Sequence, residues 1–473
     1  MKILLSTPPT QQGAGYKNDP FLQFYAPPLG LAYIAAVLEE AGYRPKILDA
    51  QSLGLSLKEF VDRVQRLRPD ILGVQTFTPS FGETLDVAVQ SKAIGIPWVV
   101  LGGAHPTLAP DETLTLGRGH IDLVIRGEAE YTFLELVRRL ELGKSLTDLR
   151  GISYQENGQI MHNPDARLID NLDSLPFPAR HLLPMDVYRI FSTRLAATTA
   201  ISSRGCPYNC SFCTVSHFYG RHWRMRSATN IADELELLSD YGTIAIAFVD
   251  DLFGLNPRRV RELCREIRRR RLDEALIWGA TVRADIKSSL LKSMADAHCK
   301  MVFVGVESAK QKTLDNVKKG ITLTKVKDFF KHVKRNHIGT IGSFALGFPG
   351  ETKQDILATI EWAITLNPNL AVFTLATPYP GTAFWEECIK KGWVKEEEYH
   401  MYNLFNPVIE TIQLTLEDLK VLLRYAYKRF YLRFKKLAEE YLRELSLSWN
   451  YGFKTYLRNA KIAFNGLKYF QRL

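Results

Sequence analysis

The sequence predicts an α/β protein with a doubly wound parallel sheet at its N-terminus, followed by a partial (β/α)6 barrel. Its 473 residues exceed the usual size of one domain, about 100–200 residues. Two series of short apolar runs alternate with amphipathic helical stretches, and a proline-containing segment separates the two series. We therefore expect four parts, over residues 1–140, 141–194 (a linker), 195–395 (the barrel) and 396–473 (a helical region).

The N-terminal series has the rhythm of repeated βαβ units. Its strand-like runs are Lys2–Ser6, Arg44–Leu48, Asp70–Thr76, Trp98–Leu101 and Asp122–Arg126. Helical stretches are expected over about 30–42, 57–67, 82–93 and 130–142. Ligands of such sheets lie beyond the carboxyl ends of the strands. The residues at these ends are Gln75–Ser80, Gly102–Pro106 and Arg126–Glu128, and paired glycines there let a backbone approach a flat or phosphate-bearing ligand.

The linker and the second series are distinguished by proline content and by periodicity. Leu175-Pro176-Phe177-Pro178 cannot form a regular helix or a central strand. Beyond it, strand-like runs are Ala196–Ile201, Thr243–Phe248, Leu276–Ala280, Met301–Val306, Ile338–Leu346 and Leu370–Leu375. Helical stretches such as 229–240 and 257–270 separate them, which is the pattern of a barrel or an open part of one.

The charge of the chain is concentrated near its C-terminal end. Residues 420–473 hold 13 Lys and Arg against 3 Asp and Glu, which equals the whole net charge of +10, and they also hold 13 aromatic residues. Three interpretations stay open: a helical cap over the substrate pocket, a helix in a membrane interface, and a surface that binds nucleic acid.

Overall composition is that of an ordinary globular protein. Hydrophobic residues make up 46% and charged residues 24% of the chain, which excludes wholesale disorder. No window of 18 apolar residues predicts a spanning helix, and the opening residues do not resemble a signal peptide. We therefore expect a cytoplasmic protein, with peripheral membrane association through the C-terminal region as a further expectation.

Three of the six cysteines lie together in Arg204-Gly205-Cys206-Pro207-Tyr208-Asn209-Cys210-Ser211-Phe212-Cys213. This segment follows the first strand of the barrel, where barrel active sites lie. Most iron–sulfur clusters use four cysteines and structural zinc takes four protein ligands, so a set of three leaves one iron of a [4Fe-4S] cluster open. The alternatives are a zinc site completed by His217, His222 or a distant cysteine, and a non-catalytic sensor. Cys264, Cys299 and Cys388 are interpreted as core cysteines.

The Cys206-x3-Cys210-x2-Cys213 motif resembles the radical S-adenosylmethionine (SAM) superfamily. Residues 1–140 resemble the N-terminal Rossmann-like cobalamin-binding domain of its B12-dependent branch. Further motifs similar to those of the superfamily are Trp223–Ser227, Phe248–Phe253, Val282–Asp285, Gly305–Ser308, Leu346–Thr352 and, for the B12-dependent branch, Tyr427–Arg433.

The resemblance implies three cofactors: a [4Fe-4S] cluster, SAM and cobalamin. It implies metal ligation by Cys206, Cys210 and Cys213. The residues it implies for SAM are Asp250, Asp251, Arg283, Asp285, Glu307 and Ser308, and those for cobalamin are Thr76, Gly102, Gly103, His105, Gly127 and Glu128. The Asp-x-His-x-x-Gly motif of methionine-synthase-like domains is missing, so either cobalamin binds without a protein histidine or the domain is empty.

The implied activity is reductive cleavage of SAM to a 5′-deoxyadenosyl radical and attack on an unactivated carbon. We expect a transferase that moves a methyl group through cobalamin, or an enzyme of radical rearrangement or cyclisation. The expected partners are a flavodoxin or ferredoxin reductant and a small-molecule or lipid substrate. RNA methylation or methylthiolation is an alternative, but methylthiotransferases usually carry three further cysteines in the N-terminal domain, and this chain has no cysteine before Cys206.

Overall fold

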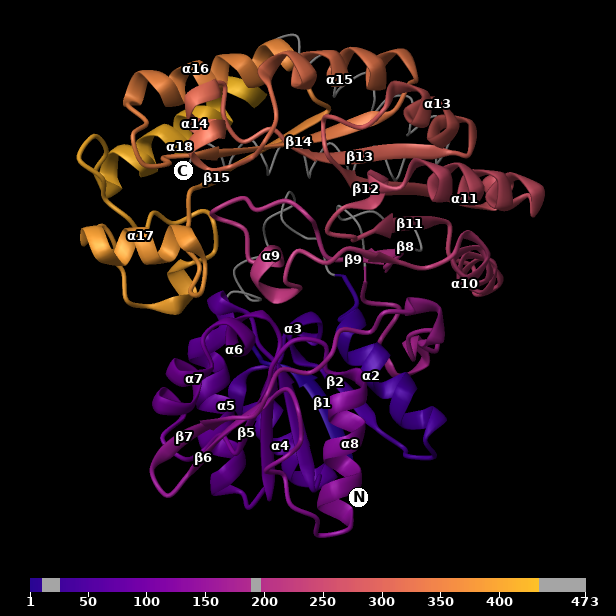
Figure 1. The fold of residues 1–473 in the computed structure, drawn as a ribbon, viewed down its shortest axis with the longest axis vertical. Helices are drawn as coiled ribbons and strands as arrows, with labels where there is room; N and C mark the ends of the chain where they lie inside the picture. Colours follow the sequence, from indigo (N-terminus) through magenta and orange to yellow (C-terminus); the bar gives the residue numbers. More distant parts are fainter. Residues whose placement is uncertain (11–25, 189–196, 434–473) are drawn as a thin grey trace.

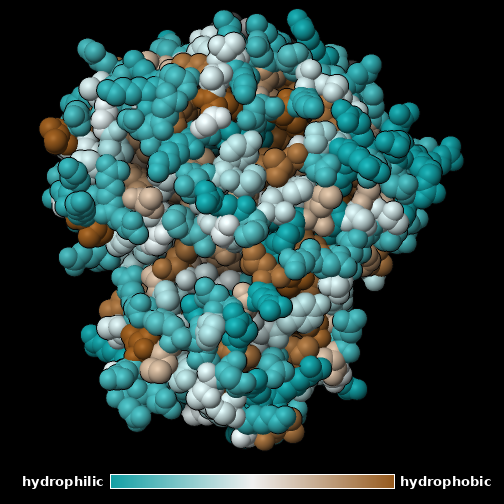
Figure 2. Space-filling model, in the orientation of Figure 1, coloured by the Kyte–Doolittle hydropathy of each residue, from teal (hydrophilic) through white to brown (hydrophobic). Residues whose placement is uncertain are grey.

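The computed structural model describes residues 1–10, 26–188 and 197–433 of the chain. Two lobes are stacked along the longest axis of the molecule (Figure 1), with the N-terminal sheet in one and the barrel in the other. Apolar side chains gather at the waist where the two lobes meet (Figure 2).

The N-terminal lobe is built on a seven-stranded sheet in the order β2-β1-β3-β4-β5-β6-β7. Its parallel strands are β1 (Ile3–Thr7), β2 (Lys46–Asp49), β3 (Ile71–Gln75), β4 (Trp98–Gly102) and β5 (Leu123–Ile125). Its helices are α2 (Leu29–Glu40), α3 (Ala50–Leu53), α4 (Leu57–Leu67), α5 (Phe81–Ala93), α6 (Ala104–Leu108), α7 (Pro110–Gly117) and α8 (Glu130–Glu141). The expected doubly wound fold is confirmed.

Helices cover both faces of this sheet. On one face α2 and α8 pack together over Leu5, Val100 and Ile125, and on the other α4 and α5 pack over Leu4 and Val74. The strands are therefore apolar at consecutive positions, as expected for a parallel sheet buried on both sides.

The segment that we expected to be a linker also contributes to the sheet. A hairpin of β6 (Ile152–Glu156) and β7 (Gln159–His162) joins the edge of β5 in antiparallel orientation. The sheet thus continues beyond residue 140, and the irregular connection begins after His162. Two 3₁₀ turns, η2 (Leu172–Ser174) and η3 (Arg180–Leu182), lie in that connection, and the polar alternation of β6 and β7 is typical of an edge hairpin.

The second lobe has six parallel strands in sequence order, which confirms the partial barrel. The strands are β8 (Ala197–Ala200), β11 (Ala245–Phe248), β12 (Ile277–Val282), β13 (Cys299–Gly305), β14 (Gly339–Leu346) and β15 (Leu370–Leu375). The helices are α10 (Ala228–Asp240), α11 (Pro257–Arg269), α12 (Leu272–Ala275), α13 (Ser288–Asp296), α14 (Gln311–Asn316), α15 (Leu323–Arg335) and α16 (Lys353–Leu366). Within the described residues β8 and β15 are the edges of the sheet and do not pair with each other.

Among the residues that the structure describes, helices cover only the outer face of the barrel sheet. Trp278, Val304 and Phe344 point outward into the core formed with those helices. The alternate residues on the inner face are partly exposed, and Phe303 of β13 retains 37% of its accessible surface. Cys264 and Cys299 lie in the outer core, and Cys388 is a buried residue of α17 (Ala383–Lys391) in a separate apolar cluster, so their interpretation as core cysteines is confirmed.

The described part of the C-terminal region is less helical than expected. Residues 402–415 form turns and an isolated bridge, and one α-helix, α18 (Leu416–Tyr431), follows them. The Tyr431 hydroxyl accepts from the Ala371 N–H at 3.1 Å and donates to its carbonyl at 3.0 Å, and the Tyr427 hydroxyl donates to the Phe373 carbonyl at 3.0 Å. These tyrosines thus cover the edge of β15.

Most of the basic, aromatic segment falls on residues 434–473, which lie outside the described residues. Within the described residues, no helix has the length and apolar character needed to cross a membrane.

Candidate active site at the boundary of the two lobes

Backbone contacts hold the cysteine loop in place near its start and further along its length. It starts after β9 (Ser203–Arg204), which pairs with β10 (Arg224–Met225), and it runs into the short helix α9 (Val215–Phe218). Gly205 has φ +87°, and a Cβ at this position would lie 1.9 Å from the His222 carbonyl oxygen, so only glycine fits. Further along, the Ser211 N–H donates to the Val317 carbonyl at 3.0 Å, which ties the loop to the barrel.

The three thiols of the loop lie near one another, with Cys210 buried and Cys206 and Cys213 partly exposed. Burial raises the pKa of Cys206 and of Cys210, and it raises the pKa of Cys213 to about 11. Backbone N–H groups oppose this rise at Cys206 and Cys213, and Lys319 and Arg283 oppose it at Cys210. Buried thiolates need cationic partners and N–H donors, which is the environment that iron–sulfur ligands use.

The described residues contain no group of three His, Cys, Asp or Glu side chains that could share a single metal ion. A cubane cluster makes a different demand, because each thiolate binds its own iron. The donor set therefore fits a cluster held by three separate corners, with His217 and His222 exposed on the surface.

Asp250 and Asp251, at the end of β11, have different surroundings. Asp250 is 3% exposed and accepts from the Ser202 N–H at 2.7 Å and from the Ser202 and Ser203 hydroxyls at 2.5 Å. Both its oxygens are thus occupied within the protein. Asp251 accepts from the Gly205 N–H at 2.8 Å and lines an open cavity, and burial raises its pKa to about 6.

The strand ends of β12 and β13 bring further charges to the cysteine loop. The Arg283 guanidinium stacks 3.6 Å from the ring centre of Tyr208 and lies 3.3 Å from Asp285. The buried Lys319 ammonium donates to Glu307 at 2.7 Å, and its positive charge opposes the rise in the pKa of the Cys210 thiol. The expected residues Arg283, Asp285 and Glu307 are thus brought together beside the cysteines.

Ser308 points elsewhere. Its hydroxyl donates to Glu351 at 2.8 Å, and Glu351 accepts from the N–H groups of Gly347 and Phe348 at 3.0 and 3.1 Å. This buried network shapes the turn after β14. The structure therefore places Ser308 in a structural hydrogen-bond network.

A cavity of about 350 Å³ opens between the carboxyl ends of the N-terminal strands and the cysteine loop. From the N-terminal lobe its lining includes Gln75, Gly102, Gly103, Gly127 and Glu128; from the barrel lobe it includes Arg204, Thr214, Val215, Phe218, Tyr219 and Asp251. The volume is within the range of ligand sites, about 300–1,000 Å³. One cavity therefore touches both cofactor regions expected from the sequence.

The glycines of this wall fit a large flat ligand. A Cβ on Gly102 would meet nothing closer than the Ile125 carbonyl at 3.8 Å, so packing within the protein does not require glycine at the end of β4. The missing side chain leaves the strand end bare toward the cavity. Gly103 differs: it has φ +105°, and a Cβ there would lie 2.7 Å from the Thr76 carbonyl oxygen.

Thr76 and His105 lie behind the wall and do not line the cavity. Thr76 is fully buried, and its N–H donates to the Gly102 carbonyl at 2.8 Å. The His105 ring packs 4.0 Å from the Phe81 ring and against Tyr399, its Nδ1 lies 3.3 Å from the Thr78 hydroxyl, and burial lowers its pKa to about 3. Its position is that of a buried neutral support.

Three residues escaped the sequence analysis as site candidates: Arg204, Glu130 and Lys319. Arg204 directly precedes the cysteine motif, and the signal that could have found it is that an arginine beside a buried loop needs an anionic partner. Glu130 and Lys319 belong to no recognisable motif, and only the folded chain brings them to Arg204 and to Cys210.

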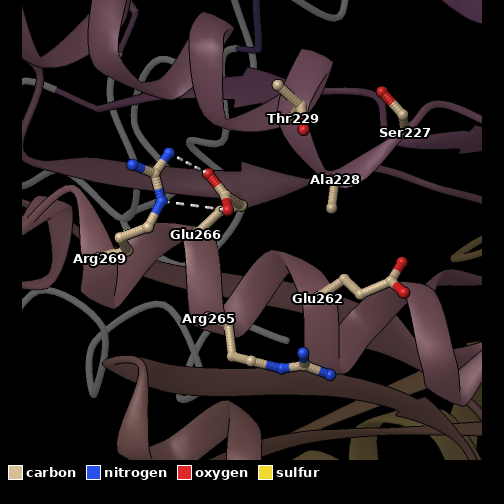
Figure 3. A pocket seen from close by; sticks show the side chains of 7 residues that line it. All are labelled: Ser227, Ala228, Thr229, Glu262, Arg265, Glu266 and Arg269. Atoms are coloured by element: carbon tan, nitrogen blue, oxygen red, sulfur yellow. Dashed lines mark hydrogen bonds and ion pairs between the residues drawn. The ribbon is translucent and has the colours of Figure 1, made fainter.

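A surface depression lies between α10 and α11 (Figure 3). Its lining is Ser227, Ala228, Thr229, Glu262, Arg265, Glu266 and Arg269, with Glu266 and Arg269 paired at 2.7 Å. None of the cysteines contributes to it, and its charged side chains belong to solvated helix faces.

Two family models match the chain and divide it as the fold does. The B12 binding domain matches residues 22–137, and the radical SAM superfamily matches residues 200–363. The first match includes β2 to β5 of the N-terminal sheet, and the second includes β11 to β14 of the barrel sheet, with the cysteine loop near its start.

Relatives extend the similarity over nearly the whole chain. An uncharacterized methyltransferase of Pyrococcus horikoshii is 37% identical over 93% of this chain and 94% of its own length. The cytidylyl-2-hydroxyethylphosphonate methyltransferase of Streptomyces wedmorensis is 29% identical over 78% of this chain and 79% of its own.

Two solved structures share the fold. The cobalamin-dependent radical SAM enzyme OxsB superposes with a TM-score of 0.72 at 16% identity, over 90% of this chain and 65% of that chain. The methyltransferase TsrM of Kitasatospora setae, with cobalamin and a [4Fe-4S] cluster bound, superposes with a TM-score of 0.68 at 20% identity, over 82% of this chain and 75% of that chain.

The two-sheet fold, the loop of three cysteines and the cavity shared by both lobes agree with these similarities. The protein is an enzyme whose cofactors are a [4Fe-4S] cluster, SAM and cobalamin. The chain belongs to the radical SAM superfamily, in the branch that carries an N-terminal B12-binding domain.

Proposed function

We propose that this enzyme transfers a methyl group to an unactivated carbon of a small molecule. The observation that supports this most is the single cavity walled by the N-terminal strand ends and by the cysteine loop. A methyl carrier in that cavity would lie against the loop that holds the cluster. Radical cyclisation is the second candidate, because relatives at 29% identity are named anaerobic magnesium-protoporphyrin IX monomethyl ester cyclase.

When bound, the [4Fe-4S] cluster supplies the electron that cleaves SAM, and cobalamin supplies the carrier for the methyl group. In this proposal Cys206, Cys210 and Cys213 hold the cluster. Arg283 offers a guanidinium for the SAM carboxylate. Asp251 offers a carboxylate to the same cofactor, and this carboxylate already orients the start of the loop by accepting from the Gly205 N–H. Asp250 acts behind them by fixing the two serines that precede the loop.

On the cobalamin side, Gly102, Gly103, Gly127 and Glu128 form the wall, with Thr76 and His105 supporting it from behind. The His105 ring is enclosed by Phe81 and Tyr399, so we infer that it stays off the ligand. This fits cobalamin binding without a protein histidine, the first of the two possibilities that the sequence left open. The N-terminal sheet as a unit, and not residues 1–140 alone, is proposed as the cobalamin-binding domain.

The apolar character of the inner face of the barrel sheet favours a substrate that has an apolar portion. Its half-exposed residues include Met301, Phe303 and Ile341, and the charged residues stand at the carboxyl ends of the strands. We further propose a flavodoxin or ferredoxin as reductant and a cytoplasmic location. The composition of residues 420–473, with 13 basic and 13 aromatic residues, supports peripheral contact with a membrane.

The test is an oxygen-free reconstitution with iron, sulfide and hydroxocobalamin, followed by SAM labelled in its methyl group and a small-molecule extract of the source cells. We expect 5′-deoxyadenosine after reduction and the label in an extracted compound. Cys210→Ala removes one of three cluster ligands, so it should abolish 5′-deoxyadenosine formation.

Because Cys210 lies outside the cobalamin cavity, this variant should still bind hydroxocobalamin as the wild type does. Cys264→Ala, in the outer core, is the matched control and should keep SAM cleavage. A wild-type enzyme that cleaves SAM but leaves no label in any product would contradict methyl transfer and favour cyclisation.

A further inference from the structure

A buried group of ion pairs crosses the boundary between the two lobes. The Arg204 guanidinium donates to Glu128 at 2.8 Å and to Glu130 at 2.6 Å, and it lies over the Tyr33 ring at 5.1 Å from its centre. Arg224 donates to the second oxygen of Glu128 at 2.6 Å. All four charged side chains are less than one-tenth exposed, so solvent screens these pairs little.

The two arginines and the two glutamates come from opposite lobes. Arg204 ends β9 and Arg224 starts β10, in the barrel lobe, whereas Glu128 and Glu130 stand where α8 begins, in the N-terminal lobe. The positive end of the helix dipole favours both carboxylates there. Burial raises the pKa of Glu128, but the Arg204 charge and the Arg224 hydrogen bond outweigh it and hold that pKa below its usual range.

This group adjoins both cofactor regions at once. Gly205, next to Arg204, has no room for a side chain, because a Cβ there would lie 1.9 Å from the His222 carbonyl oxygen, and Cys206 follows directly. Arg204, Glu128 and Glu130 also line the cavity. Any displacement of the Arg204 side chain would therefore act on the first cluster ligand and on the cavity wall together.

The two glutamates are not equivalent. Glu128 has further donors in Arg224 and in the Ile169 N–H at 2.8 Å. Glu130 pairs with Arg204 across the boundary, so neutralising Glu130 removes one of the two carboxylates that orient the guanidinium. Arginine is suited to this because its planar fork can bind two acceptors in fixed directions, and lysine cannot.

We propose that Arg204 is a positioning residue that couples cobalamin binding to the cluster: held by Glu128 and Glu130, it fixes the start of the cysteine loop against the wall of the cobalamin cavity. The inference rests on the proposed function, since it assigns hydroxocobalamin to this cavity. It predicts that loading one site changes the affinity of the other, by linkage.

The experiment measures the dissociation constant of hydroxocobalamin by absorbance titration, in full-length protein with and without a reconstituted cluster. In the wild type we expect the cluster to change this constant by about tenfold. In Glu130→Gln and in Arg204→Lys the ratio should fall to about one, since neither keeps both charged contacts of the guanidinium. The two substitutions combined should add little to either alone.

Glu135→Gln is the matched control, because it makes the same change on the same helix at a partly exposed pair with Arg139, away from the lobe boundary, and it should keep the wild-type ratio. Iron content and thermal unfolding are measured for every variant. A ratio that stays at the wild-type value in Glu130→Gln overturns the coupling. Loss of the folded structure in both Glu130→Gln and Arg204→Lys also overturns it, because these residues would then maintain the fold. A wild type that binds no hydroxocobalamin refutes the proposed function instead.

Discussion

The two parallel sheets of this enzyme are buried differently. In β3, Ile71, Leu72 and Val74 are each no more than 2% exposed, because helices cover both faces of the N-terminal sheet. In β13, Val302 and Val304 are fully buried while Phe303 between them is 37% exposed. A sheet covered on both faces offers a ligand only its strand ends, whereas a sheet covered on one face also offers the other.

This difference separates the proposed cobalamin site, at the strand ends of the N-terminal sheet, from the proposed substrate site on the inner face of the barrel. Bare glycines and one cavity mark the strand ends of the N-terminal sheet. The barrel adds an uncharged inner face below the charged residues that surround the cysteine loop. Each prediction below changes one side of this comparison.

The largest effect is expected for the two faces of the barrel sheet. Phe344→Ala removes a fully buried ring that stacks on Phe373 at 5.4 Å, and it should lower the free energy of unfolding by about 3–5 kcal/mol. Phe303→Ala, one strand away on the inner face, should lower it by less than about 1 kcal/mol, because this ring is already part-exposed. Denaturant unfolding of the cluster-free protein measures both.

Equal losses at Phe344 and Phe303 would mean that the inner face is packed, and the comparison would fail. With a substrate in hand, Phe303→Ala should raise KM more than Phe344→Ala does.

The next effect concerns the buried support of the N-terminal strand ends. Since burial lowers the pKa of His105 to about 3, the unfolded chain takes up this proton at higher pH than the folded chain. The contribution to stability is therefore complete above about pH 6.5 and is lost as the pH falls toward 3, by about 1.4 kcal/mol per pH unit. Unfolding measured from pH 7 to 5 should show this slope.

His105→Phe keeps an aromatic ring beside Phe81 and should remove that part of the slope. His337→Phe, at an exposed position, is the control and should leave the slope at its wild-type value. A pH dependence that is the same in His105→Phe and the wild type would show that His105 is protonated in the folded chain.

The smallest effect is expected at the cavity wall itself. Gly102→Val fills the bare end of β4 without meeting backbone, so it should weaken hydroxocobalamin binding by about tenfold, or about 1.4 kcal/mol, with little change in unfolding. Cleavage of SAM should continue, because the barrel side is untouched. Gly82→Val, at an exposed helical glycine with open space around it, should leave the affinity unchanged. Unaltered affinity in Gly102→Val would place cobalamin elsewhere.

Much of the fold could be predicted because the burial of both sheets produces a regular pattern of apolar residues along the sequence. The five N-terminal strands and the six barrel strands lie within a few residues of the expected runs, since consecutive apolar positions and helical periodicity are local properties. The β6–β7 hairpin was missed because its edge strands are polar and short. Residues 402–415 were expected to be helical, but their backbone partners are distant, as in the bridge between Val394 and Ile409.

The site divides in the same way. The cysteine set is contiguous, and its spacing alone predicts a three-thiolate centre. Asp250 and Ser308 follow strands as a cofactor contact would, yet each is occupied by protein donors or acceptors, Asp250 by Ser202 and Ser203 and Ser308 by Glu351. A position at a strand end predicts where a residue lies, but it does not predict whether hydrogen bonds within the protein already occupy its side chain.

The sequence by itself determined the two parallel sheets, the three cysteines and the family, because each rests on residues close together in the chain. Only the tertiary structure decided that His105 lies behind the cavity wall, that Lys319 stands by Cys210, and that Arg204 meets Glu128 and Glu130 across the lobe boundary. The contacts of Arg204 and Lys319 join residues between 74 and 109 positions apart, and the His105–Tyr399 contact joins residues 294 positions apart. Such pairings are fixed by packing and charge compensation, which no local pattern encodes.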